Sequence, residues 1–169
     1  MSYSTLWEVY KTKVISVKEF HNGHGTGPAI WDCICQNFLG FEEYSWLTED
    51  HMNTLWPSWE NPEIPDFLRF TLMVTYDRSY IEPNRLIEAA DYLDKGHEYI
   101  LAHTSWVWSH FEAIALTLRQ LTDRKLDHRL LGIGLGCTSV SDPWEDGYPK
   151  YGQTPWGIFE KFDTVGKGD

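Results

Sequence analysis

His21-Asn-Gly-His-Gly-Thr-Gly-Pro-Ala-Ile-Trp-Asp-Cys-Ile-Cys-Gln-Asn-Phe-Leu-Gly40 is the stretch of the sequence that most clearly predicts a fold. It opens as a loop, because its closely spaced glycines give the backbone freedom and Asn-Gly is a turn signal. A helix follows, because Thr26 can cap it and Pro28 suits its first turn. Apolar residues then recur at helical spacing until Gly40, which stands where helices commonly end.

The segments on either side of this stretch predict further elements. Residues 6–17 are rich in β-branched and aromatic types with partial alternation, so we expect one strand there, bent near Thr12. Thr48 is expected to cap a short helix that carries acids in its first turn. Residues 67–76 fit either a buried strand or a buried helix. The helix is preferred, since Pro65 and Asp66 form a suitable N-terminus.

The second half of the chain predicts two more helices. An amphipathic helix is expected from Pro83 to Lys95, ended by Gly96. Ser105 is expected to cap the longest helix of the chain. The apolar residues that recur along that helix are Val107, Phe111, Ile114, Leu118 and Leu121.

The C-terminal part predicts two strands. In residues 131–137, apolar residues alternate with glycines, which indicates a strand whose glycine face is covered at short range by a helix or a Trp ring. A loop is expected at 142–154, a last strand at Trp156–Phe162 and a polar tail at 164–169.

Together these elements predict an α+β fold. We expect a single compact domain over residues 1–163, with about four to five helices packed on a small sheet. The 169 residues are enough to bury a substantial core, and 42% hydrophobic with 23% charged residues is the composition of an ordinary globular protein. Nine Trp, nine Tyr and eight Phe argue against disorder. No apolar run approaches the length of a membrane-spanning helix, and three cysteines indicate no disulfide framework. A cytoplasmic protein is therefore expected.

The net charge of the chain indicates which kinds of partner it can bind. The formal net charge of −11 repels phosphate backbones, so direct binding of nucleic acid is not expected. The same field would attract a basic protein surface. Acidic charge also keeps proteins soluble, and this alternative needs no partner at all.

Residues 19–68 concentrate this charge. The block contains nine acids, four tryptophans and no Lys or Arg. Aromatic rings beside carboxylates suit a surface rich in Arg and Lys. Rings packed beneath loops, with solvated acids outside, are the alternative. The candidate binding residues are Glu42, Glu43, Trp46, Glu49, Asp50, Trp56, Trp59 and Glu60, with Trp144 and Trp156 as further loop tryptophans.

The Gly-rich loop is the second candidate site. Its residues are His21, Asn22, Gly23, His24, Gly25 and Thr26. Free backbone N–H groups before a helix can bind an anion, although the loop lacks the Lys-Ser/Thr of a P-loop, and a structural turn is the alternative. A zinc site is not predicted, because Cys33 and Cys35 point to different faces of a helix. They are expected to be one core thiol and one partly exposed thiol. No cofactor is predicted.

Several short segments resemble a group of small uncharacterised phage and prophage proteins. They are Leu6-Trp-Glu-Val, Phe20-His-Asn-Gly, Gly27-Pro-Ala-Ile-Trp-Asp, Thr75-Tyr-Asp-Arg78 and Cys137-Thr-Ser-Val140. The resemblance implies a phage or mobile-element origin and action by binding host machinery. It implies no activity and no catalytic residues.

Three functional hypotheses follow. The first is a non-enzymatic interaction protein, such as a phage-encoded inhibitor of a basic host protein that handles nucleic acid or acts in defence. The second is a small hydrolase or transferase that binds a phosphorylated or nucleotide ligand at residues 21–26. The third is a structural subunit or immunity-type protein. No nucleophile–base–acid pattern can be named from the sequence.

Overall fold

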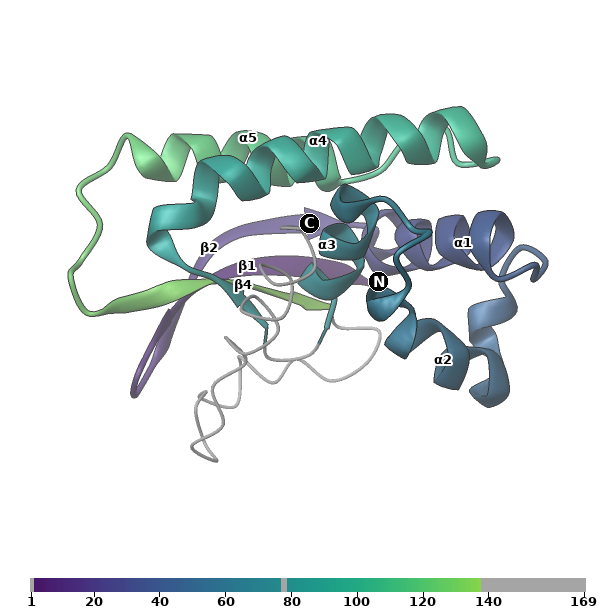
Figure 1. Ribbon diagram of the computed structural model, residues 1–169. Helices are drawn as coiled ribbons and strands as arrows, with labels where there is room; N and C mark the ends of the chain where they lie inside the picture. Colours follow the sequence, from purple (N-terminus) through teal and green to yellow (C-terminus); the bar gives the residue numbers. More distant parts are fainter. Residues whose placement is uncertain (1, 77–78, 138–169) are drawn as a thin grey trace.

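A four-stranded antiparallel sheet forms the base of the molecule (Figure 1). The computed structural model describes residues 2–76 and 79–137. The strands are β1 (Tyr3–Tyr10), β2 (Val14–His21), β3 (Tyr80–Ile81) and β4 (Leu130–Cys137), in the spatial order β2-β1-β4-β3. β1 and β4 are the two inner strands, so they carry most of the pairing.

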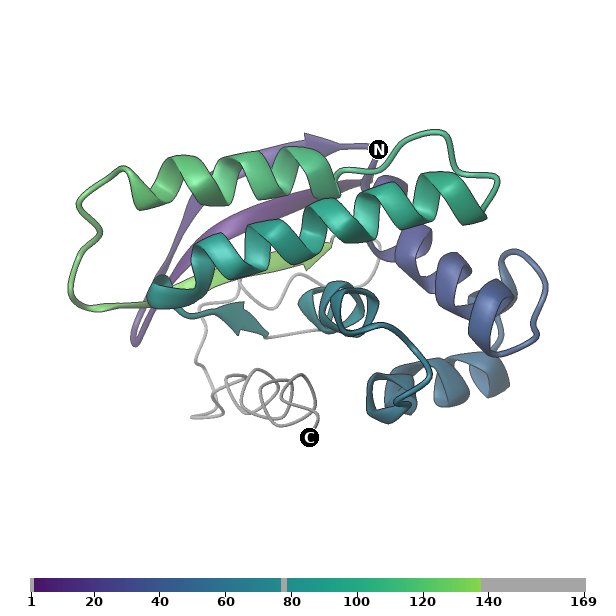
Figure 2. The same ribbon diagram turned by 45° about the horizontal axis from the view of Figure 1, so that its top comes forward.

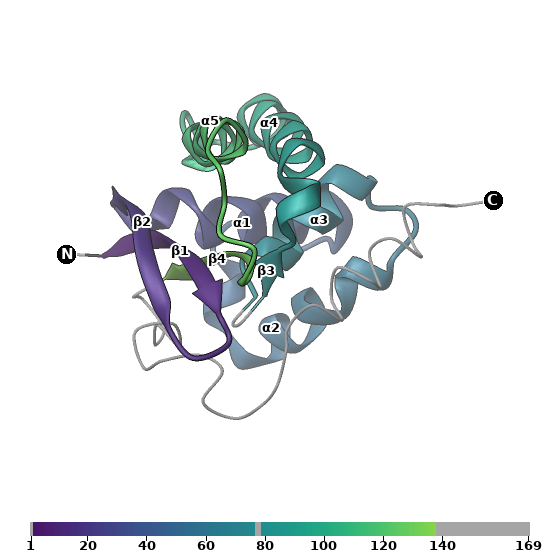
Figure 3. The same ribbon diagram turned by 90° about the vertical axis from the view of Figure 1, so that its left-hand side faces the viewer.

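Five helices complete the described fold, which confirms the α+β prediction. They are α1 (Gly27–Phe38), α2 (Glu49–Leu55), α3 (Asp66–Val74), α4 (Leu86–His103) and α5 (Phe111–Thr122). α4 and α5 run side by side over one face of the sheet, and Figure 3 shows them end-on above the strands (Figures 2 and 3). α1 and α2 lie at one end of the molecule, opposite the β1–β2 turn (Figure 1).

One apolar core joins the sheet to the helices. Leu6 of β1 and Ile133 of β4 belong to the same buried cluster as Ile30 of α1, Phe70 of α3 and Phe111 of α5. Each of these side chains is almost completely removed from solvent. The apolar residues that recur at helical spacing in the sequence are therefore buried on the inner faces of the helices.

The strand predicted over residues 6–17 is wrong as a single element. The structure contains a hairpin there, with β1 and β2 joined at Lys11, Thr12 and Lys13. The amide of Tyr10 donates a hydrogen bond to the carbonyl of Lys13 (2.9 Å), which closes the turn. Lys11, Thr12 and Lys13 are polar and exposed, which suits a turn that faces solvent.

Three helix predictions in the first half are confirmed. α1 occupies the expected residues, and Gly40 after it has a φ of +70°, the conformation that favours glycine at a helix end. α2 is capped by the Thr48 hydroxyl, which accepts the amide of His51 (3.4 Å). Residues 66–74 form α3, so the helix was the right choice for that segment.

Two helix boundaries in the second half are corrected. α4 does not end at Gly96 but continues to His103, which makes it the longest described helix, with 18 residues. Ser105 does not cap a helix, since α5 begins only at Phe111. Val107 lies in the intervening turn and is 84% exposed. The other four apolar residues assigned to that helix are buried in α5, so the periodicity was correct only from Phe111 onward.

Gly96 stays inside α4 because the helix packs closely on α3. A Cβ at this position would lie 2.5 Å from the hydroxyl oxygen of Thr71. The glycine is therefore a contact point between two helices rather than a stop signal.

One glycine of β4, Gly132, is closely covered, although not by the predicted helix or Trp ring. A Cβ on Gly132 would lie 2.3 Å from the carbonyl oxygen of Ile81 and 2.4 Å from the ring of Tyr80. The covering group at this position is therefore β3 with its tyrosine, and not a helix or a Trp ring.

Some predictions fall outside the described residues. These are the loop at 142–154, the strand at 156–162, the tail at 164–169 and the placement of Trp144 and Trp156. Among the helices in residues 2–76 and 79–137, none has the length and apolar character needed to cross a membrane.

Replacing Gly96 by Ala tests the close contact between α3 and α4. Alanine is the better helix former, yet we expect Gly96→Ala to lower the free energy of unfolding by about 1 to 3 kcal/mol through overpacking against Thr71. Denaturant unfolding measures the change. Glu98→Ala, at an exposed position of the same helix, is the matched control and should change stability by less than about 0.5 kcal/mol. Equal stability of Gly96→Ala and wild type would contradict the packing described.

Candidate interaction surface

The carboxylate of Asp32 is the centre of the most elaborate polar arrangement in the first half of the chain. Asp32 lies on α1 and is completely buried. Its Oδ1 accepts the backbone N–H of Tyr44 (2.8 Å) and the indole N–H of Trp46 (2.6 Å). Its Oδ2 accepts the indole N–H of Trp106 (2.9 Å). One side chain therefore ties α1 to two separate loops.

These hydrogen bonds stabilise a charge that burial opposes. Burial raises the pKa of Asp32 above its ordinary value of 3.8, while the donors Trp106, Tyr44 and Trp46 act in the opposite direction. Within the described residues, no Lys, Arg or His forms an ion pair with this carboxylate. Among residues 2–76 and 79–137, the partners of this carboxylate are all neutral N–H groups.

Asp32 brings residues 39–48 next to residues 104–110. A second contact joins the same loops, because the Ser105 hydroxyl donates to Oε1 of Glu43 (2.8 Å). Each indole held by Asp32 also contacts a more exposed ring: the ring centroids of Trp46 and Tyr44 are 6.4 Å apart, and those of Trp106 and Trp108 are 6.3 Å apart. The loops therefore have a fixed relation to each other.

The two loops expose an unusual share of apolar surface. Tyr44 is 49%, Leu47 68%, Val107 84% and Trp108 39% exposed. The carboxylates of Glu42 and Glu43 are exposed next to Tyr44 in the chain. We call this set, Glu42, Glu43, Tyr44, Leu47, Val107 and Trp108, the two-loop surface. Exposed apolar groups bordered by charge are typical of protein interaction sites.

Tyr44 adopts a backbone conformation that L-residues with a side chain avoid. Its φ is +61°, and its N–H is the one that Asp32 accepts. A non-glycine residue in this left-handed region costs about 1 to 2 kcal/mol. Such outliers concentrate at binding sites, where the surrounding structure fixes them.

The predicted acidic residues and the predicted tryptophans differ in their exposure to solvent. Glu42, Glu43, Glu49, Asp50 and Glu60 are all exposed. Trp46, Trp56 and Trp59 are partly buried and pack against the core.

The half-buried tryptophans belong to an internal ring cluster. The ring of Trp31 lies 5.3 Å from that of Trp46 and 5.4 Å from that of Trp56, centroid to centroid. Trp56 in turn contacts Tyr76 at 5.0 Å. The more exposed aromatic side chains of the two loops are Tyr44 and Trp108, which the sequence did not single out.

The Gly-rich loop at residues 21–26 forms a short 3₁₀ turn whose amides are largely used. The N–H groups of Asn22 and Gly23 donate to the carbonyl of Ser2, and those of Gly25 and Thr26 donate within the loop. His110 contacts this loop twice. Its backbone N–H donates a hydrogen bond to the carbonyl of Gly25 (2.8 Å), and its ring Nε2 lies 2.7 Å from the carbonyl oxygen of His21. Binding of an anion here stays a prediction, and these four amides are not free for it.

Gly25 has a specific steric role. A Cβ there would lie 2.0 Å from the ring of Trp108. The glycine therefore lets this indole rest directly on the backbone of the loop. His24 is exposed beside it.

Both cysteines of α1 are buried, so the expectation of one partly exposed thiol is wrong. The reason is that α1 is covered along its length from Gly27 to Cys35 by neighbouring elements. Burial raises the pKa of Cys33 to about 12 and that of Cys35 to about 11. In the part of the chain that the structure describes, no group of three or more His, Cys, Asp or Glu side chains could hold a metal ion.

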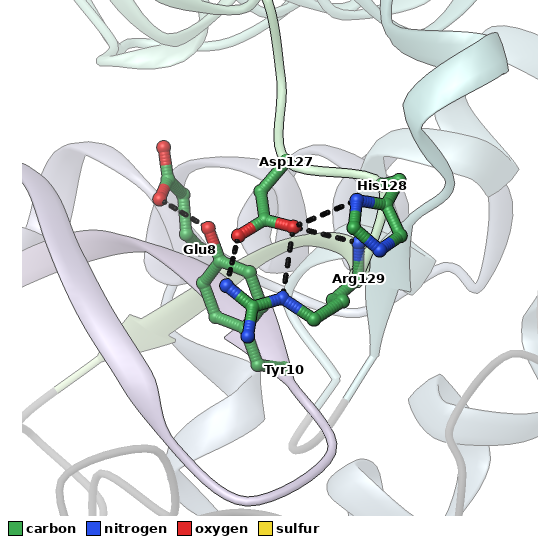
Figure 4. Close-up of polar contacts among 5 residues, drawn as sticks. All are labelled: Glu8, Tyr10, Asp127, His128 and Arg129. Atoms are coloured by element: carbon green, nitrogen blue, oxygen red, sulfur yellow. Dashed lines mark hydrogen bonds and ion pairs between the residues drawn. The ribbon is translucent and has the colours of Figure 1, made fainter.

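The opposite end of the molecule carries basic residues. The exposed cations there are Lys11, Lys13, Arg124, Lys125 and Arg129. Part of this positive charge is neutralised, because Arg129 pairs with Asp127 (2.7 Å) and lowers the pKa of that carboxyl (Figure 4). Figure 4 also shows the hydroxyl of Tyr10, which donates a hydrogen bond to the carboxylate of Glu8 (2.9 Å). Burial and the Glu8 carboxylate raise the pKa of Tyr10 to about 12.

The sequence contained only part of the signal for this surface. The acids were visible in residues 19–68, but Val107 was assigned to a helix because its spacing to Phe111 is helical. The positive φ of Tyr44 and the approach of Trp106 to Asp32 depend on contacts between distant segments.

Asp32→Asn tests the junction of the two loops. The Asn oxygen can still accept N–H groups, but its NH₂ would then face the indole N–H of Trp106 or, in the flipped orientation, the N–H groups of both Tyr44 and Trp46. We expect the free energy of unfolding to fall by about 2 kcal/mol, the scale of a hydrogen bond to a charged group. Denaturant unfolding measures this, with exposed Asp50→Asn as the control. A loss no greater than that of the control would show that the junction contributes little.

Tyr44→Gly and Tyr44→Ala form a matched pair that tests the backbone strain. Both remove the ring, but only glycine adopts positive φ freely. We expect the Gly variant to be more stable than the Ala variant by about 1 kcal/mol, the reverse of the usual order. Thermal unfolding of the two proteins decides it. Greater stability of the Ala variant would mean that the loop has another conformation in solution.

Comparisons with protein-family models, with curated proteins and with solved structures find no match to the chain.

Proposed function

We propose that the protein is a non-enzymatic interaction module that binds a basic surface of a partner protein through its two-loop surface. The observation that carries this proposal is the arrangement around Asp32. Two loops are fixed together and between them expose four apolar side chains and the carboxylates of Glu42 and Glu43. A surface of this kind offers both apolar burial and charge complementarity to a cationic partner.

The distribution of charge supports the same partner. Residues 19–68 carry nine acids without a single Lys or Arg, and five exposed cations lie at the far end of the fold. The electrostatic potential at the α1–α2 end is therefore more negative than the net charge of the chain alone implies. A basic partner would be attracted to this end in a defined orientation, and salt would slow its association.

The resemblance to small phage and prophage proteins extends the proposal to a biological role. An acidic phage protein of this kind would act as an inhibitor that occupies the basic surface of a host protein engaged in defence or in handling nucleic acid. Occupation of such a surface blocks nucleic acid by competition, because both ligands need the same cations.

Charge reversal tests the proposal. The variant with Glu42, Glu43, Glu49 and Asp50 replaced by Lys should lose a partner captured from host lysate by the tagged wild-type protein. Capture should also weaken with added salt. The readout is mass spectrometry of bound proteins at low and moderate ionic strength, after circular dichroism has confirmed that the variant folds.

The matched control reverses four exposed acids elsewhere. Replacement of Glu19, Glu98, Glu112 and Asp123 by Lys changes the net charge equally but leaves the two-loop surface intact. This control should retain the partner. If both variants lose the partner equally, only the net charge matters for binding. If the variant reversed at Glu42, Glu43, Glu49 and Asp50 still captures the partner, the proposal is refuted.

A further inference from the structure

We infer that the two-loop surface is selective for arginine over lysine, so that the partner presents arginine side chains to it. This inference rests on the proposed function and names the chemistry of the partner. It follows from the way carboxylates and aromatic rings are combined in the two loops.

Glu43 lies at the centre of the combination. Its Oε1 accepts the hydroxyl of Ser105, which holds the carboxylate at the junction of the loops. Glu43 directly precedes Tyr44 in the chain, and its charge is the largest cause of the raised pKa of Tyr44. An exposed ring and a held carboxylate therefore stand on adjacent residues of one loop.

Trp108 supplies the second ring. Its indole rests on the backbone of Gly25, and it contacts the rings of His110 (5.1 Å) and Trp106 (6.3 Å). These neighbours fix the ring while it stays 39% exposed. A fixed ring loses little conformational entropy when a partner binds, which favours affinity.

Arginine matches this pairing better than lysine does. A guanidinium is planar and weakly hydrated, so it can stack on an aromatic face and donate two N–H groups to a carboxylate. An ammonium is a compact, strongly hydrated charge that does neither equally well. Within the described residues, the ion pairs of this chain do not involve Glu42 or Glu43, so no internal cation competes for them.

The test compares two synthetic peptides that differ only in their basic residue: alternating arginine and glycine, or alternating lysine and glycine at the same positions. Calorimetry with the full chain should give a dissociation constant about tenfold lower for the arginine peptide. Tyr44→Ala and Trp108→Ala should each reduce this preference severalfold. Leu116→Ala, which removes an exposed apolar side chain on the outer face of α5, should preserve it.

The outcomes separate this inference from the proposed function. Equal affinity for the two peptides overturns the arginine inference and leaves the binding of basic partners intact. Absence of binding to either peptide counts against both. A preference that survives in the doubly substituted Tyr44→Ala, Trp108→Ala protein, with its fold confirmed by thermal unfolding, would also overturn the assignment to these rings.

Discussion

The buried carboxylate of Asp32 is the constraint on which the α1–α2 end of the molecule depends. It accepts three N–H groups from two loops and has no described cation beside it. A buried charge without such donors would be strongly unfavourable, so the loops and the carboxylate stabilise each other. The left-handed backbone of Tyr44 follows from this arrangement, because its N–H must reach Oδ1.

The helical layer gives this junction a rigid base. α1 is buried from Gly27 to Cys35, and α4 crosses above the sheet in close contact with α3 at Gly96. The turn between α4 and α5 therefore has a fixed position, which places Trp106 over Asp32 and Trp108 on Gly25. Because the interior is closely packed, the small residues at these contacts determine where the exposed rings lie on the surface.

The glycines of residues 21–27 illustrate how one pattern can have two explanations. Closely spaced glycines before a helix are consistent with an anion site, and they also permit close packing. Here Gly25 lies under the ring of Trp108 and Gly27 under that of Trp31. The structural role accounts for both residues, and it links the loop directly to the two-loop surface.

The sequence by itself determined the α+β class, the helices α1, α2 and α3, and the acidic character of residues 19–68, because periodicity, caps and charge are local properties. Only the tertiary structure decided that residues 3–21 form a hairpin and that Gly96 lies inside a helix. It also decided which aromatic side chains are exposed. The exposed rings are those of Tyr44 and Trp108, whereas the predicted Trp46, Trp56 and Trp59 are partly buried. Exposure depends on contacts between segments far apart in the chain, such as Asp32 with Trp106, and no local pattern encodes them.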